Sequence, residues 1–145
     1  METRTSMAGT RSGAGLTGDV RALIVLLAVS GIGHFVRPGP FEQIVPQLLP
    51  HKRALVYASG IAEVACAAAL ARAETRRLGG LATAALMVAV FPANVQMAVT
   101  ANADDRSTKA YRFGTVARLP LQLPLVVIAL KAARQASPPP GARRR

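Results

Sequence analysis

Four long apolar runs alternate with short polar stretches along this chain of 145 residues. The runs cover residues 20–36, 54–71, 78–101 and 116–133. A helix needs about 20 residues to cross a hydrocarbon core of roughly 30 Å, and about 17 is the lower limit. Each run is long enough, so the pattern predicts four membrane-spanning helices.

A shorter periodic segment lies between the first two runs. Its apolar residues recur at the helical spacing i, i+3, i+4, i+7 and i+8, namely at Phe41, Ile44, Val45, Leu48 and Leu49. Pro40 suits the first position of a helix, and Pro46 breaks or bends it. We therefore predict an all-α protein, a transmembrane four-helix bundle with a short amphipathic interfacial segment between helices 1 and 2.

The two ends of the chain lack the apolar groups that a folded core requires. Residues 1–18 are rich in Gly, Ser, Thr and Arg, and residues 135–145 are rich in Pro and Arg. We expect a disordered cytoplasmic tail over 1–18, a membrane domain over 19–134 and a disordered basic tail over 135–145. An alternative reads the first run as a cleaved signal peptide, but the run continues past the candidate cleavage site at Ala28-Val-Ser30.

The net charge of +11 is spread over the ends of the apolar runs. Membrane proteins keep Lys and Arg at these places, whereas nucleic-acid modules interleave them with aromatic residues. The sequence therefore predicts a lipid bilayer as partner and no nucleic acid. Eleven Lys and Arg lie on the side of both termini and the 72–77 hinge, and seven lie on the other side. The positive-inside rule then predicts a multi-pass protein of the cell membrane with both termini cytoplasmic.

Polar side chains inside the apolar runs gather in the outer half of this topology. They are His34, Tyr57, Ser59, Glu63, Asn94, Gln96, Arg118 and Gln122. Ser59 and Glu63 are four residues apart and share a helix face, as do Arg118 and Gln122. We predict an ion pair between Glu63 and Arg118. The layer has two interpretations: hydrogen bonds that join helices, or a pocket for a small polar or quinone-like ligand.

Residues that carry catalysis or bind metals are sparse. Cys66 is the single cysteine, so the chain has no CxxC pair and no cysteine zinc site. His34 has no second histidine inside the runs, and we assign no metal site. No nucleophile–base arrangement is visible, so no catalytic residue is assigned and we expect no catalytic activity of its own.

Several short motifs, in order along residues 20–133, resemble the DoxX family of small bacterial membrane proteins. They are Gly33-His-Phe35, Pro38 with Phe41, Ile44-Val-Pro46, Leu49-Pro50, Tyr57-Ala-Ser-Gly60 with Glu63, Phe91-Pro-Ala-Asn94 with Met97, and Arg118-Leu-Pro120 with Gln122. The resemblance implies four transmembrane helices in the bacterial inner membrane. It also implies a subunit or accessory of a quinone-linked oxidoreductase complex, with other complex subunits or a second copy as partners.

The sequence thus leaves three functions open. The resemblance favours a non-catalytic subunit of a membrane oxidoreductase complex, and although no cofactor motif is evident, it leaves room for a quinone near Glu63. The alternative is a small transporter or channel with a polar layer around Glu63 and Arg118. An enzyme acting on a lipid-soluble substrate ranks last, because the residues for its chemistry are missing.

Overall fold

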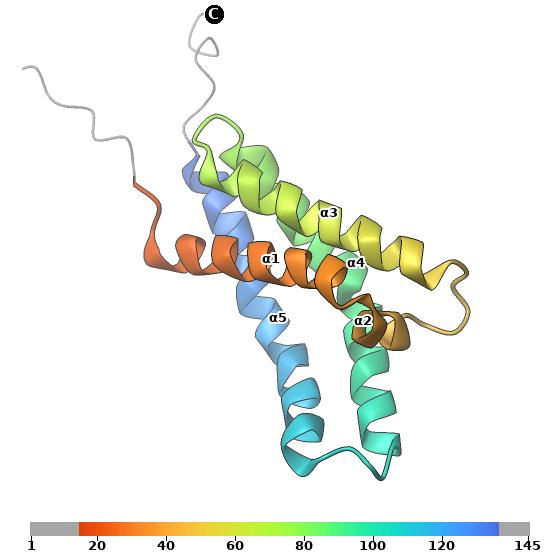
Figure 1. Cartoon of the computed structure of the whole chain (residues 1–145). Coiled ribbons are helices and arrows are strands. Elements are labelled where there is room, and N and C mark those ends of the chain that lie inside the picture. Colours follow the sequence, from red (N-terminus) through yellow and green to blue (C-terminus); the bar gives the residue numbers. More distant parts are fainter. Residues whose placement is uncertain (1–14, 137–145) are drawn as a thin grey trace, which may run out of the picture.

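The computed structural model describes residues 15–136, and this part of the chain forms five α-helices and no strand (Figure 1). The helices are α1 (Gly18–Val36), α2 (Pro38–Ile44), α3 (Lys52–Ala71), α4 (Arg76–Ala103) and α5 (Lys109–Gln135). Four of them, all except α2, are long and apolar enough to cross a membrane. The predicted all-α architecture with four spans is confirmed. The predicted tails lie outside the described residues except for 15–18 and 135–136.

The helices extend further into the polar stretches than the sequence pattern predicts. We expected the fourth span to begin near residue 116, but α5 begins at Lys109. The Thr108 side chain caps this helix by accepting a hydrogen bond of 3.2 Å from the backbone N–H of Tyr111. A capped first turn allows the polar residues before the span to be helical, so the α4–α5 loop is short.

The amphipathic segment after α1 is a shorter helix than its apolar spacing predicts. Helix α2 has Pro38, not Pro40, at its first position, and it ends at Ile44. Pro46 explains the end, because a proline in a helix lacks the N–H that would bond to the fourth residue before it. Leu48 therefore lies outside the helix and is 95% exposed.

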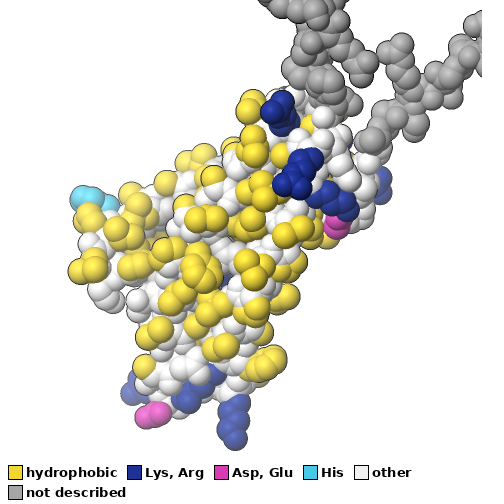
Figure 2. All heavy atoms as spheres, turned by 180° about the vertical axis from the view of Figure 1, so that it is seen from behind, with side chains coloured by type: hydrophobic (Ala, Val, Ile, Leu, Met, Phe, Trp, Pro, Cys, Tyr) yellow, Lys and Arg dark blue, Asp and Glu magenta, His cyan; other side chains and the backbone are white. Residues whose placement is uncertain are grey.

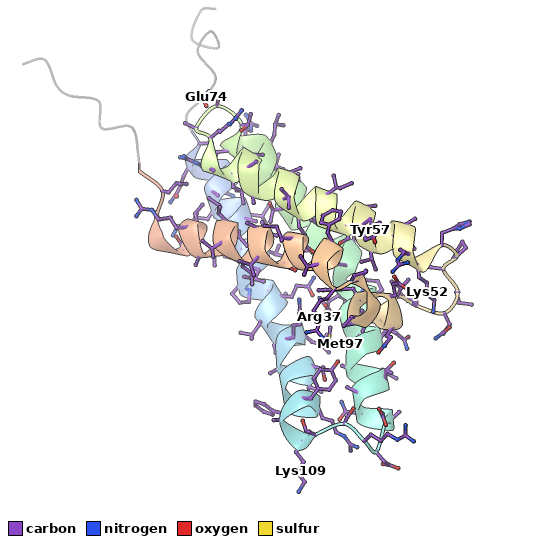
Figure 3. The ribbon with its side chains drawn as sticks, in the orientation of Figure 1. Arg37, Lys52, Tyr57, Glu74, Met97 and Lys109 are labelled. Carbon is purple, nitrogen blue, oxygen red and sulfur yellow. The ribbon has the colours of Figure 1, made fainter. Side chains whose placement is uncertain are left out.

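The long helices form two pairs that cross at an angle (Figure 1). Helix α1 packs along α3, and α4 packs along α5. The pairs meet at the end where α3 turns into α4, marked by Glu74 in Figure 3. They diverge from there, so that Lys52 of α3 and Lys109 of α5 lie at well-separated ends (Figure 3). We call the end at residues 72–75 the closed end and the opposite end the open end.

The apolar core belongs to the closed end. Leu23, Leu70 and Thr83 are fully buried there. Small residues allow close packing, since a Cβ on Gly79 would lie 2.7 Å from the backbone N of Leu70. A Cβ on Gly80 would likewise lie 2.8 Å from the backbone N of Ala133. Helices in lipid associate through such close backbone contacts, so these glycines join α3, α4 and α5.

The surface has the character of a protein in a bilayer. Figure 2 shows Lys and Arg gathered at the two ends of the molecule, with hydrophobic side chains covering the region between them. Large apolar side chains of the membrane-spanning helices are exposed, among them Val88 at 67% and Val127 at 63%. Water would disfavour so much exposed apolar surface, whereas lipid tails accommodate it. The protein is therefore a multi-pass membrane protein.

Candidate ligand-binding site

A cavity of about 890 Å³ lies where the two helix pairs diverge. All five helices contribute to its wall, from Phe41 of α2 at the open end to Leu27 of α1 and Met87 of α4 near the middle of the spans. Ligand sites typically occupy roughly 300–1,000 Å³ and combine apolar walls with a few polar groups. This cavity has that size and composition.

The structure brings most of the predicted polar residues to this one cavity. Six of them line it: His34, Ser59, Glu63, Asn94, Arg118 and Gln122. Tyr57 and Gln96 do not. Their immediate neighbours Val56 and Met97 line the cavity instead, and each neighbour is turned by about 100° around the helix axis. Tyr57 instead stacks on Phe35, and Gln96 donates a hydrogen bond of 3.1 Å to Thr100 of its own helix.

The wall formed by α1 and α3 carries an imidazole beside a carboxyl group. His34 Nδ1 lies 3.8 Å from Glu63 Oε2, and only 8% of either side chain is exposed. The backbones approach closely at this crossing, because a Cβ on Gly31 would lie 2.8 Å from the carbonyl oxygen of Gly60. The two glycines thus let α1 and α3 come near enough to bring His34 and Glu63 together.

Further contacts orient both side chains of this wall. His34 Nδ1 lies 2.9 Å from the carbonyl oxygen of Ser30, to which it donates when that nitrogen carries the proton. Phe41 packs on the imidazole with 4.0 Å between the ring centroids. The Glu63 carboxyl group is held by fewer contacts than the imidazole, because its Oε2 is buried and has no hydrogen-bond partner among residues 15–136. The hydroxyl groups of Ser30 and Ser59 lie near the carboxyl group, and Arg118 acts on it at longer range.

The predicted ion pair between Glu63 and Arg118 is wrong. His34 of α1 is the neighbour of the Glu63 carboxyl, and Arg118 forms no ion pair in the described part of the chain. The reason is the divergence of the two pairs, which places Glu63 and Arg118 on opposite walls of the cavity. Arg118 is exposed and lines the α5 wall.

The wall formed by α4 and α5 is held together by amide side chains. Gln122, which is buried, donates a hydrogen bond to the backbone carbonyl of Met87. Its Oε1 accepts a hydrogen bond of 3.0 Å from Asn94 Nδ2. Pro92 lacks the N–H that would bond to the Val88 carbonyl, so the Gln122 bond falls beside the weakened turn. These two amides join helices, whereas Glu63 and Arg118 have groups left to bind something else.

Some residues of the site carry no clear signal in the sequence. Ser30 and Phe41 contact the His34 ring, and Gly31 sets the α1–α3 distance, yet none of them is a predicted site residue. The spacing of four between Ser30 and His34 is the one local sign of their contact. The described residues bring together no group of three or more metal-ligating side chains.

Together, the fold and the cavity define a multi-pass α-helical membrane protein with a ligand-sized site between two helix pairs. Its chain belongs to the family of a domain of unknown function, DUF8561, whose profile matches residues 23–133. The match spans all four membrane helices. No curated protein and no solved structure matches the chain.

The resemblance to the DoxX family is wrong, because the family match is to DUF8561 and no DoxX match accompanies it. The motifs behind that resemblance are short and are built from Gly, Pro, Ala and aromatic residues. Small residues and prolines recur in membrane helices for general packing reasons, so unrelated families of four-helix proteins share such fragments.

Proposed function

We propose that this protein binds a lipid-soluble small molecule with a polar head group in the cavity between the helix pairs. The observation that carries the proposal is the cavity itself. It has a volume of about 890 Å³ and a mainly apolar wall that includes His34, Glu63 and Arg118. Convergent polar groups in an apolar pocket fix the orientation of a ligand, while the apolar wall supplies contact area. A molecule dissolved in the bilayer suits both features.

The depth of the cavity supports a ligand that comes from the membrane. The cavity ends near Leu27 and Met87, beyond which the apolar core fills the closed end. It therefore occupies about one half of the bilayer thickness. A lipid-soluble molecule reaches this depth within its own leaflet, whereas a water-soluble one would have to leave water.

The proposal includes an orientation. In the sequence, eleven Lys and Arg belong to the segments on the side of both termini and the 72–77 hinge, and seven belong to the segments on the other side, so we place both termini in the cytoplasm and the protein in the cell membrane. The cavity then belongs to the outer leaflet.

The two earlier predictions of function stay predictions. A role as subunit of an oxidoreductase complex, with a quinone, depended on the DoxX resemblance, and the family match gives it no support. A transporter or channel needs a polar path across both halves of the membrane. The cavity stops at the apolar core, so conduction would require the closed end to open.

A photoactivatable probe tests the proposed function. Dodecanol with a diazirine in its chain, added to the protein in nanodiscs and irradiated, should label the cavity-facing residues Leu27, Met87 and Leu121. Mass spectrometry of the peptides locates the label. Filling the cavity with Ala93→Phe should reduce this labelling about tenfold, because the ring occupies the space of the probe.

Ala85→Phe is the matched control. It makes the same change on the same helix, at an exposed position outside the cavity wall. This variant should keep the labelling of the unmodified protein. Label found only on outward residues such as Val25, Ile61 and Val88, or an equal effect of the two variants, would refute a binding cavity.

A further inference from the structure

We infer that the ligand is an amphiphile whose head group carries an anionic oxygen group and, beside it, a hydrogen-bond donor. This inference rests on the proposed function and names the chemistry that the cavity selects. Arg118 and Glu63 carry the argument, because they line opposite walls of one cavity and each has unused hydrogen-bonding capacity.

The guanidinium group of Arg118 is suited to bind an anionic group of the ligand. Its guanidinium group belongs to a membrane-spanning helix, lines the cavity, and has no hydrogen bond or ion pair with any residue in 15–136. A cation at membrane depth is costly unless it is paired. The planar guanidinium group binds the oxygens of a phosphate or carboxylate through two parallel hydrogen bonds, which favours such a group as its partner.

The carboxyl group of Glu63 is suited to accept a hydrogen bond from a donor on the ligand. Its Oε2 is buried and has no hydrogen-bond partner among residues 15–136, although the carboxyl group faces a cavity that a ligand can enter. The hydroxyl groups of Ser30 and Ser59 lie near the carboxyl group but leave Oε2 without a hydrogen bond. A buried polar atom without a hydrogen bond destabilises the folded protein, and a ligand N–H or O–H would remove this cost. His34 does not fill this role, since its Nδ1 is 3.8 Å away and is closer to the Ser30 carbonyl.

The two requirements together define the head group. A phosphate next to an ammonium or hydroxyl group, as in ethanolamine or glycerol phospholipids, satisfies both residues at once. A choline phospholipid has the phosphate but a quaternary ammonium that donates no hydrogen bond. A fatty acid likewise lacks the donor, and diacylglycerol lacks the anion. The apolar wall, with Leu26, Leu121 and Leu125, would contact the first part of the acyl chains.

Native mass spectrometry with defined lipids tests the inference. The full-length protein is purified in mild detergent, and equal amounts of five lipids are added separately: ethanolamine, glycerol and choline phospholipids, a fatty acid and diacylglycerol, with the same acyl chains where two chains are present. Ethanolamine and glycerol phospholipids should bind about tenfold more tightly than choline phospholipid, fatty acid or diacylglycerol. The wild-type comparison needs no variant, so it does not depend on whether a mutant folds.

Variants then assign the selectivity to residues. Arg118→Gln should lose about tenfold in affinity for both preferred lipids, whereas Arg134→Gln, on the same helix but outside the cavity, should lose nothing. Glu63→Gln should reduce the preference over choline, and Glu74→Gln in the closed-end turn is its control. Arg118→Lys, which keeps the charge but not the two parallel bonds, should be intermediate.

Equal binding of all lipid classes would overturn the inference, as would equal effects of Arg118→Gln and Arg134→Gln. Either result can occur while Ala93→Phe still reduces labelling by the neutral dodecanol probe. In that case the cavity binds ligands but does not select this head group. If, in addition, Ala93→Phe had no effect on probe labelling, the proposed function itself would be refuted.

Discussion

The closed and open ends of this molecule are built from the same four helices but packed by opposite means. At the closed end, Gly79 and Gly80 bring three helices into backbone contact around apolar side chains. At the open end, the pairs separate and polar groups face a cavity. The difference shows how a small membrane protein can hold a site open, since one well-packed end fixes the angle between two pairs.

The local contacts at the open end follow the same division. Within each pair the helices stay in contact, through Gly31 and Gly60 in one and through Gln122 in the other. Between the pairs, the residues of the open end form no ion pair in the described structure. Apart from the contacts of α2 with α4, the angle therefore depends on the closed end, and substitutions at the two ends should differ in their effect on stability.

The largest effect is expected at Gly80. In Gly80→Leu the added side chain meets the backbone of Ala129 and Ala133, which cannot move away as a flexible side chain could. We expect a loss of about 3 kcal/mol or more in the free energy of unfolding, measured by circular dichroism in mixed SDS micelles. Gly114→Leu on α5 is the control, because nothing lies within 4 Å of a Cβ there. A comparable loss in both variants would contradict the division into two ends.

Leucines at the two ends should differ next. Leu70 is fully buried in the closed-end core, and Leu70→Ala should cost about 2–3 kcal/mol by leaving a cavity. Leu121 is 60% exposed at the open end, so Leu121→Ala should cost little. The same unfolding measurement gives both values. If Leu121→Ala were as costly as Leu70→Ala, the open end would be packed in the membrane.

The amide contacts of α4 and α5 should have a smaller effect. Gln122→Leu removes the hydrogen bonds to the Met87 carbonyl and to Asn94, and should cost about 1 kcal/mol, as hydrogen bonds between membrane helices do. Asn94→Leu breaks only one of these bonds and should cost less. Equal stability of Gln122→Leu and the unmodified protein would show that these bonds do not hold the pair together.

The smallest effect is the coupling between His34 and Glu63. A double-mutant cycle with His34→Gln and Glu63→Gln should give an interaction energy of about 0.5–1 kcal/mol, since the two groups are neighbours. A second cycle with Glu63→Gln and Arg118→Gln should give less, because these residues lie on opposite walls. A larger value in the second cycle would restore the ion pair that the sequence predicts.

Much of the fold could be predicted because its signals are local. The length and apolarity of a run decide whether it can span a bilayer, and all four spans are found where the runs lie. Pro46 likewise ends α2 through its own geometry. The start of α5 was harder to predict, because a single cap at Thr108 extends the helix through polar residues.

The candidate site was predictable only in part. Ser59 and Glu63 share a face of one helix, and both line the cavity. Tyr57 and Gln96 belong to the same depth but point elsewhere, because depth follows from the position along a helix while direction depends on how that helix packs. The family assignment failed for a related reason, since motif fragments common to membrane helices do not identify one family.

By itself, the sequence determined that this chain has four helices able to cross a membrane, with ionisable groups inside them. The reason is that the length and composition of each helix decide whether it can be buried in lipid. Only the tertiary structure decided that His34 rather than Arg118 lies beside Glu63, and that a cavity separates the two helix pairs. Those outcomes depend on crossing angles, which arise from close contacts between residues far apart in the chain, such as Gly31 with Gly60 and Gly80 with Ala133.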